Sequence, residues 1–176
     1  MSTADIITTT INLAALVFLG AQVMFARNAL KETAKGQKEE WKRQRRKSSL
    51  DALLETTRYR ESMKDVLPWN DRDRKAVEAF LEEANGDRRK LAPLREYLNH
   101  LENIAIGVRQ KVFDLETISL SEGGRIIDIV TNYGTYIEGV RQELGKPLVY
   151  EEIKILASRL EDFRSRQGSA GTVPDE

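Results

Sequence analysis

The sequence predicts an all-α protein that consists of a single N-terminal transmembrane helix, a basic helical linker and a compact bundle of about five helices. Three observations predict this fold class. The chain begins with a long uncharged segment, apolar residues further on recur at spacings of three and four, and no long alternation of apolar and polar residues competes with them. With 176 residues, the chain has room for one such bundle and an appendage, but not for two large domains.

The composition excludes several classes of protein. The chain has 28 basic and 28 acidic side chains, no cysteine and one histidine. Without cysteine there is no disulfide framework and no thiolate nucleophile, so a small extracellular scaffold held by disulfides is excluded. The zero net charge hides a segregation, since residues 27–47 carry a net charge of +6 and residues 48–176 carry −5.

Residues 6–26 form the predicted membrane span, after a short N-terminus of residues 1–5. These 21 residues carry no charge and lie between Asp5 and Arg27. As an α-helix they would extend about 31 Å, which matches the hydrocarbon core of a bilayer, about 30 Å thick. A cleaved signal peptide would need basic residues before the apolar run, and a buried core helix is seldom so long without a charge.

The charges after the span predict its orientation. Nine basic residues and three acidic ones lie between Arg27 and Lys47. Because basic residues are retained on the cytoplasmic side during insertion, we expect residues 1–5 outside and the domain of residues 48–165 in the cytoplasm. Asn12 is costly in hydrocarbon without a polar partner, so self-association through the span is a hypothesis.

Residues 27–47 form a basic juxtamembrane linker. On a helix, the spacing of Lys31, Lys35, Lys38, Lys42 and Arg45 places these side chains along one side. The candidate contacts for anionic lipid or another polyanion are Lys31, Lys35, Lys38, Lys42, Arg43, Arg45, Arg46 and Lys47. The simplest interpretation is that these charges stop the transfer of the chain across the membrane and that the linker is a solvated stalk.

Distance limits what this linker can do. In a straight helix, residues 43–47 would lie about 25 to 30 Å from the bilayer surface, well beyond the Debye length of about 8 Å. Lipid contact along the whole stripe would therefore require a bend, for which Gly36 is the expected hinge. The run KRQRRK also resembles a phosphate-binding segment, but the acidic domain would repel nucleic acid, which we do not expect as a partner.

The first three helices of the bundle are predicted from their apolar stripes and stop signals. The first continues from the linker to Val66 and is stopped by Pro68, the second begins at an Asn70 cap and ends at Asn85-Gly86, and the third begins near Pro93. The residues expected on their apolar faces are Leu50, Leu53, Leu54, Met63, Val77, Phe80, Leu81, Ala84, Leu94, Leu98, Leu101, Ala105, Val108 and Val112.

Two further helices complete the bundle. Ser119 and Glu122 have the spacing of a capping box that opens the fourth helix, which Gly145 ends, and the fifth follows from about Ile153. Residues 166–176 read as a flexible tail. The expected core residues are Ile126, Val130, Tyr133, Ile137, Val140, Leu144, Ile153, Leu156, Ala157, Leu160 and Phe163.

No catalytic motif is found in the sequence. The chain has no phosphate-binding loop, no HExxH and no nucleophile elbow, and its only histidine, His100, stands alone. We therefore expect no enzyme, no catalytic residue, no cofactor and no metal site. The candidate residues are Asn99, Glu102, Asp114 and Arg141, which form either a structural network, such as an ion pair of Glu102 with Arg141, or a polar pocket that binds a partner.

Two segments of the chain resemble a bacterial family known only as a domain of unknown function. They are YLNHLENIAIGVRQKVFD, from Tyr97 to Asp114, and YIEGVRQELGKPLVY, from Tyr136 to Tyr150, whereas residues 41–51 resemble the family only loosely. The shared pattern comprises Leu98, Asn99, Glu102, the segment from Ile104 to Val108, Asp114, Tyr136, Ile137, Arg141 and Leu144. The resemblance implies a bacterial or phage origin, an inner-membrane location and a cytoplasmic helical domain, but no reaction.

These observations predict a membrane-anchored, non-enzymatic interaction or scaffold protein of the bacterial inner membrane. Its expected partners are membrane lipid and another protein or a second copy of the chain. The alternative is a membrane-tethered effector or phage-defence accessory that contacts nucleic acid or anionic lipid through the basic linker.

Overall fold

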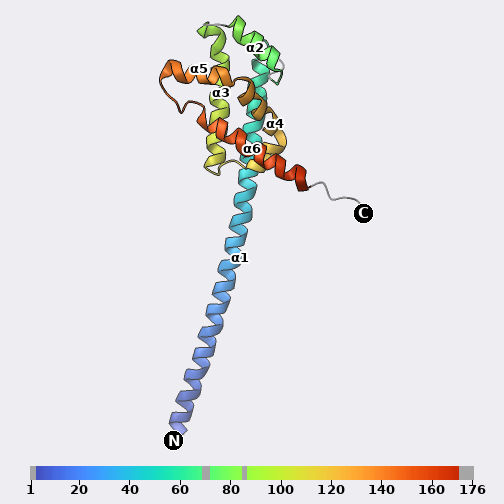
Figure 1. Ribbon diagram of the computed structural model, residues 1–176. Helices are drawn as coiled ribbons and strands as arrows, with labels where there is room; N and C mark the ends of the chain where they lie inside the picture. Colours follow the sequence, from blue (N-terminus) through green and yellow to red (C-terminus); the bar gives the residue numbers. More distant parts are fainter. Residues whose placement is uncertain (1–2, 69–71, 85–86, 171–176) are drawn as a thin grey trace, which may run out of the picture. The chain divides into compact units, whose positions relative to one another are not determined.

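The protein is all-α in the part of the chain that the structure describes. The computed structural model describes the backbone of residues 3–68, 72–84 and 87–170, and the side chains of residues 18–68, 72–84 and 87–167. The helices are α1 (Thr3–Ser62), α2 (Arg74–Glu83), α3 (Arg88–Arg109), α4 (Leu115–Asn132), α5 (Gly134–Leu144) and α6 (Glu151–Ala170), shown in Figure 1. The predicted fold class is confirmed as all-α.

The chain divides into two compact units, residues 1–43 and residues 44–176. Gly36 lies inside α1, which continues without a break from Thr3 to Ser62. The helix is therefore continuous at Gly36, where a bend would be needed for the whole basic stripe to contact lipid.

The described residues contain no helix that combines the length and the apolar character needed to cross a bilayer. Of the segment predicted to span the membrane, residues 6–26, the side chains of residues 6–17 lie outside the described part of the chain.

Helices α2 and α3 each begin at an aspartate cap, which differs from the start signal predicted for that helix. The Asp73 side chain accepts the N–H of Lys75 at the start of α2, and Asp87 accepts those of Arg89 and Lys90 at the start of α3. The expected cap of α2, Asn70, lies outside the described residues. Because Asp87 caps α3, this helix starts five residues before Pro93, which lies inside it.

The expected fourth helix is two helices, so the bundle differs from the prediction. Asp114 caps α4 by accepting the N–H of Thr117, and Ser119 is buried within the helix instead of opening it. At Tyr133, φ is −92° and ψ is 9°, so the helical backbone is interrupted and α5 starts at Gly134. The buried tyrosine ring holds this break in the core.

The core lies where α6 packs against α3 and α4. The largest fully buried side chains are Tyr97, Tyr133, Leu94, Leu98, Ile118, Ile126, Ile129, Ile137, Ile153, Leu156, Leu160 and Val77. Burial of these apolar surfaces makes the largest favourable contribution to the folding free energy of a helical bundle.

Four residues expected on buried faces are exposed instead. Val112 lies beyond the end of α3, and Leu144 is the last residue of α5, so neither continues its helix stripe. Leu50 and Leu54 are exposed on α1, which buries Leu53 and the nearby Thr56 instead. The apolar spacing placed Leu53 correctly on the buried side of α1, but not its neighbours Leu50 and Leu54.

Candidate functional site

Arg141 on α5 holds the connection between α5 and α6. Its side chain is only 10% exposed. Its Nε donates to the carbonyl oxygen of Val149 at 2.8 Å, Nη1 contacts Glu138 at 2.9 Å, and Nη2 contacts Glu151 at 2.7 Å. The guanidinium thus links α5, the connecting turn and the first residue of α6.

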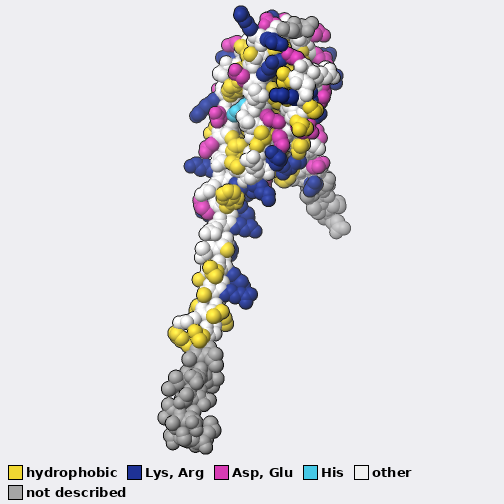
Figure 2. Space-filling model, turned by 90° about the vertical axis from the view of Figure 1, so that its left-hand side faces the viewer, with side chains coloured by type: hydrophobic (Ala, Val, Ile, Leu, Met, Phe, Trp, Pro, Cys, Tyr) yellow, Lys and Arg dark blue, Asp and Glu magenta, His cyan; other side chains and the backbone are white. Residues whose placement is uncertain are grey.

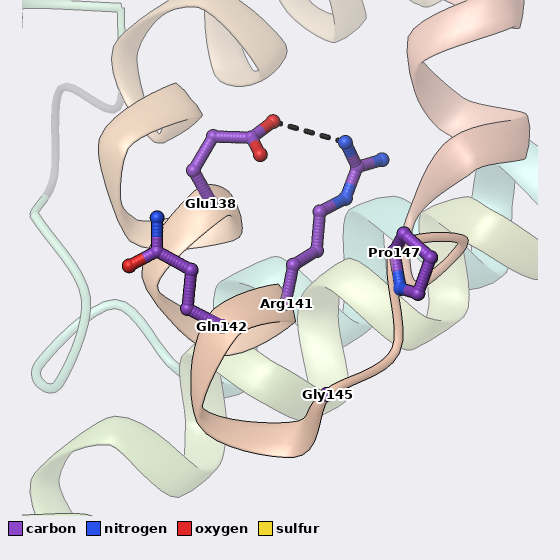
Figure 3. Close-up of a pocket in the computed structure, with 5 residues that line it drawn as sticks. All are labelled: Glu138, Arg141, Gln142, Gly145 and Pro147. Atoms are coloured by element: carbon purple, nitrogen blue, oxygen red, sulfur yellow. Dashed lines mark hydrogen bonds and ion pairs between the residues drawn. The ribbon is translucent and has the colours of Figure 1, made fainter.

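A hollow of about 360 Å³ lies beside this arginine (Figure 3). It is lined by Glu138, Arg141, Gln142, Gly145 and Pro147. Figure 3 shows the guanidinium of Arg141 turned toward the carboxylate of Glu138, its partner in the ion pair. Gly145 ends α5 with a φ of 61°, a left-handed conformation that glycine adopts without strain. The donors of Arg141 are already engaged by Val149, Glu138 and Glu151. The hollow is therefore a depression in the surface and does not present a free reactive group.

Glu102 on α3 caps the start of α6. Its two carboxylate oxygens accept the backbone N–H groups of Glu152, at 3.2 Å, and Ile153, at 2.8 Å. Tyr150, the residue before α6, has a φ of 58°. The predicted ion pair of Glu102 with Arg141 is therefore not formed, and each residue binds the α6 end of the chain separately.

Burial and neighbouring acidic groups shift the pKa of the Glu102 carboxyl in one direction, and its hydrogen bonds shift the pKa in the other. Burial raises the pKa of Glu102 above its usual range and is the largest effect, while the N–H groups of Ile153 and Glu152 lower it. The nearby carboxylates of Glu152 and Glu151 raise it further. Burial also raises the pKa of the Tyr150 hydroxyl, to about 12.

This shift has a defined effect on the pH dependence of stability. A carboxyl whose pKa is higher in the folded state binds a proton more tightly there than in the unfolded chain. The contribution of Glu102 to stability is therefore greatest below its unfolded pKa and falls as the pH rises through the raised folded value.

Asp114 joins the start of α4 to α1. Its carboxylate accepts hydrogen bonds from the backbone N–H of Thr117 and from the Thr117 hydroxyl, and its own N–H donates to Ser49 Oγ at 2.7 Å. Arg45 of α1 donates to the carbonyl oxygen of Phe113 at 3.0 Å and lies 4.0 Å from the Asp114 carboxylate. Arg45, which the sequence assigned to the basic stripe, thus binds within the helical domain.

The four candidate residues do not assemble into one pocket. Asn99 is exposed on α3, Asp114 lies at the α1–α4 contact, and only Glu102 and Arg141 act near the same helix start. Glu102, Asp114 and Arg141 each bind groups within the fold, and these contacts are separate from one another.

His100 takes part in a contact that the sequence did not predict. Its Nε2 lies 2.8 Å from Thr56 Oγ1 of α1, and its ring stacks on Tyr59 at a centroid distance of 5.8 Å. Tyr59 also donates to the carboxylate of Glu96, and burial raises its pKa to about 12. The signal in the sequence was the spacing of Thr56 and Tyr59, three apart on α1, which places both on one side of that helix.

The remaining residues of the basic stripe are exposed in the N-terminal unit. The side chains of Lys31, Lys35, Lys38 and Arg43 are exposed, and Lys42 pairs with Glu39 at 3.2 Å. In Figure 2, the basic side chains of this unit project from one side of the helix. In the other unit, Lys47 is exposed and Arg46 lies 3.7 Å from Glu116.

No metal site is formed within the ranges that the structure describes, because no three His, Asp or Glu side chains gather closely enough there.

The helices and the exposed basic residues define the class of protein: it has an α-helical domain and, in the same chain, an exposed basic helix. The sequence matches the family described as "Domain of unknown function (DUF4760)" over residues 6–160, and the chain belongs to this family. No curated protein and no solved structure matches the chain.

Proposed function

We propose that the protein is a non-enzymatic interaction protein anchored in a bacterial inner membrane by residues 6–26. Residues 1–5 lie outside the cytoplasm, and the helical domain binds a protein partner or a second copy in the cytoplasm. Lys31 and Lys35, the residues of the basic stripe nearest to the span, contact anionic headgroups.

The observation that carries the anchor is a run of exposed apolar side chains. Phe18, Leu19, Val23, Met24 and Phe25 are 56% to 78% exposed on α1. Contiguous apolar surface of this kind belongs in a membrane or an interface. The preceding residues 6–17 are uncharged in the sequence, and the family match includes them, so the apolar segment is part of the shared domain.

The observation that favours a protein partner is an apolar corner on a rigid turn. Leu148 is 75% exposed, and Leu144 and Pro147 are exposed beside it. The bonds of Arg141 to Val149 and Glu151 hold this turn in place. Because the backbone of this turn is already held, its ordering costs little conformational entropy on binding, which favours Leu148 as an anchor.

Extraction of membranes tests the anchor. We expect the full chain to remain in the membrane pellet after washing with carbonate at high pH and to be released only by detergent. Leu13→Arg combined with Val17→Arg should release it, because each arginine at mid-span costs about 2.5 to 3.5 kcal/mol. The matched control is Thr33→Arg combined with Gln37→Arg, the same charges at the same spacing beyond the span, and it should stay in the pellet.

Release of the unaltered chain by carbonate would contradict the anchor. Retention of the mid-span double variant to the same extent as the control would contradict it as well.

Cross-linking in intact membranes tests the interaction. We expect Leu148→Asp to reduce the yield of cross-linked species at least several-fold, because the charge cannot enter an apolar contact. The control is Leu54→Asp, which changes a leucine that is 57% exposed on α1. A purely monomeric chain with no cross-linked partner, or equal yields for both variants, would refute this part of the proposal.

A further inference from the structure

Two arginines from distant parts of the chain, Arg72 and Arg164, approach the same residue of α4, Gly124. Arg72 precedes α2, and Arg164 lies on α6. The position that a Cβ atom would take at Gly124 is 3.7 Å from Arg72 Nη2 and 3.7 Å from Arg164 Nη1. The two nitrogens therefore lie no further apart than twice this distance, although like charges repel.

Only one of these two charges is balanced by an acid. Arg72 forms an ion pair with Asp128 of α4. Arg164 donates from Nη1 to the carbonyl oxygen of Ser119 at 3.3 Å, and no carboxylate among the described residues pairs with it. A net positive charge thus remains at this point, in a domain whose residues 48–176 carry −5 overall.

The arginine of α6 also lines a hollow. Its volume is about 460 Å³, and its lining residues are Ser119, Leu120, Arg164 and Gln167. The lining offers a guanidinium and a side-chain amide and includes no carboxylate. Both polar side chains can donate hydrogen bonds, and guanidinium groups form their strongest hydrogen bonds with carboxylates and phosphates.

We propose that this site binds a phosphate group, with Arg164 as its principal ligand, Arg72 as the second cation and the amide of Gln167 as a further donor. A tetrahedral oxyanion accepts from donors about 2.7 to 2.9 Å away on several sides, so Arg164 can bind it in the hollow. Arg72, which lies near the same point of α4 but outside the lining of the hollow, adds a second positive charge. A bound anion would also reduce the repulsion between the two arginines. The phosphate belongs either to a small soluble ester or to a lipid headgroup, since both present the same group.

The site is separate from the apolar corner at Leu148 and does not depend on the proposed function. Its residues come from α4, α6 and the segment before α2, whereas the corner is formed by α5 and the turn before α6.

Thermal unfolding of the full chain in a neutral detergent tests the site. We expect inorganic phosphate at about 10 mM to raise Tm by about 3 °C relative to chloride at equal ionic strength, because a ligand that binds the folded state stabilises it. Arg164→Gln should abolish the shift. Arg159→Gln removes an exposed arginine of the same helix that does not line the hollow, and it should keep the shift.

Gly124→Asp provides a second variant that is independent of any loss of Arg164. Its carboxylate would lie beside both guanidinium groups and compete with the phosphate, so the shift should again disappear. Glycerol 3-phosphate, and detergent micelles that contain phosphatidic acid, distinguish the two sources. A shift with either probe that Arg164→Gln abolishes supports the site.

The inference is overturned if no phosphate probe shifts Tm more than chloride does. It is overturned equally if Arg164→Gln and Gly124→Asp retain the full shift.

Discussion

Replacing Gly107 by alanine is expected to destabilise the helical domain by about 1 to 2 kcal/mol, although alanine favours a helix by about 1 kcal/mol. Gly107 is buried in α3, and its carbonyl oxygen accepts the N–H groups of Val112 and Phe113. The chain thus folds back over the glycine, and a Cβ atom there would overlap the Phe113 ring. The ring would have to move, at the expense of its packing.

The matched control is Gly139→Ala. Gly139 also lies inside a helix, α5, but it is exposed and no atom lies within 4 Å of the position of its Cβ atom. This substitution should stabilise the domain by about 0.5 to 1 kcal/mol. The two variants should therefore differ in Tm by about 6 °C or more in thermal unfolding. Equal Tm values would show that the ring does not restrict Gly107.

Arg141→Ala is expected to destabilise the domain by about 2 kcal/mol. The substitution removes a hydrogen bond to a backbone carbonyl and two carboxylate contacts from a side chain that is only 10% exposed. Loss of a partner costs about 1 to 3 kcal/mol where the remaining group is shielded from water. The two carboxylates are partly exposed and contribute little, so the contact with Val149 dominates.

Urea unfolding of Arg141→Ala measures this loss. Arg88→Ala serves as the control, since its side chain is 81% exposed and its ion pair with Glu143 should be worth less than about 0.5 kcal/mol. Arg141→Lys should lie between the two, because lysine keeps the charge but loses the planar fork of donors. Unchanged stability of Arg141→Ala would instead mean that Arg141 serves a partner and not the fold.

The apolar spacing predicted most of the helices and of their buried faces, but it merged α4 and α5 into one helix. Leu94, Leu98 and Leu101 on α3, and Ile153 and Leu156 on α6, are buried as their positions indicated. These residues follow the helical period closely, and the period depends on local geometry alone. The family resemblance was confirmed as well, whereas the membrane span and the bacterial origin stay predictions.

The helix starts were less predictable because several residues nearby can act as caps. Asp73, Asp87 and Asp114 were present in the sequence, but Asn70, Pro93 and Ser119 carried equally plausible start signals. Tertiary packing decides among such candidates. Ser119, for example, is buried in α4 and cannot lie at its start.

The partners of the candidate site residues could not be predicted from side-chain types. Glu102 accepts two backbone N–H groups about 50 positions further along the chain, and Arg141 donates to a backbone carbonyl. Every residue except proline presents these backbone groups, so the sequence contains no mark of the pairing. The ion pair of Glu102 with Arg141, which was one example of a structural network, is replaced by these separate contacts.

The cap that α3 supplies to α6 has a consequence for the order of folding. The first N–H groups of a helix have no partner within that helix, and those of α6 are satisfied by a carboxylate of α3 that lies about 50 positions earlier in the chain. The start of α6 therefore gains these hydrogen bonds only once α3 has formed and the segment between the two helices has folded back, which couples α3 and α6 in one cooperative transition. During synthesis, these bonds form only after α6 has left the ribosome.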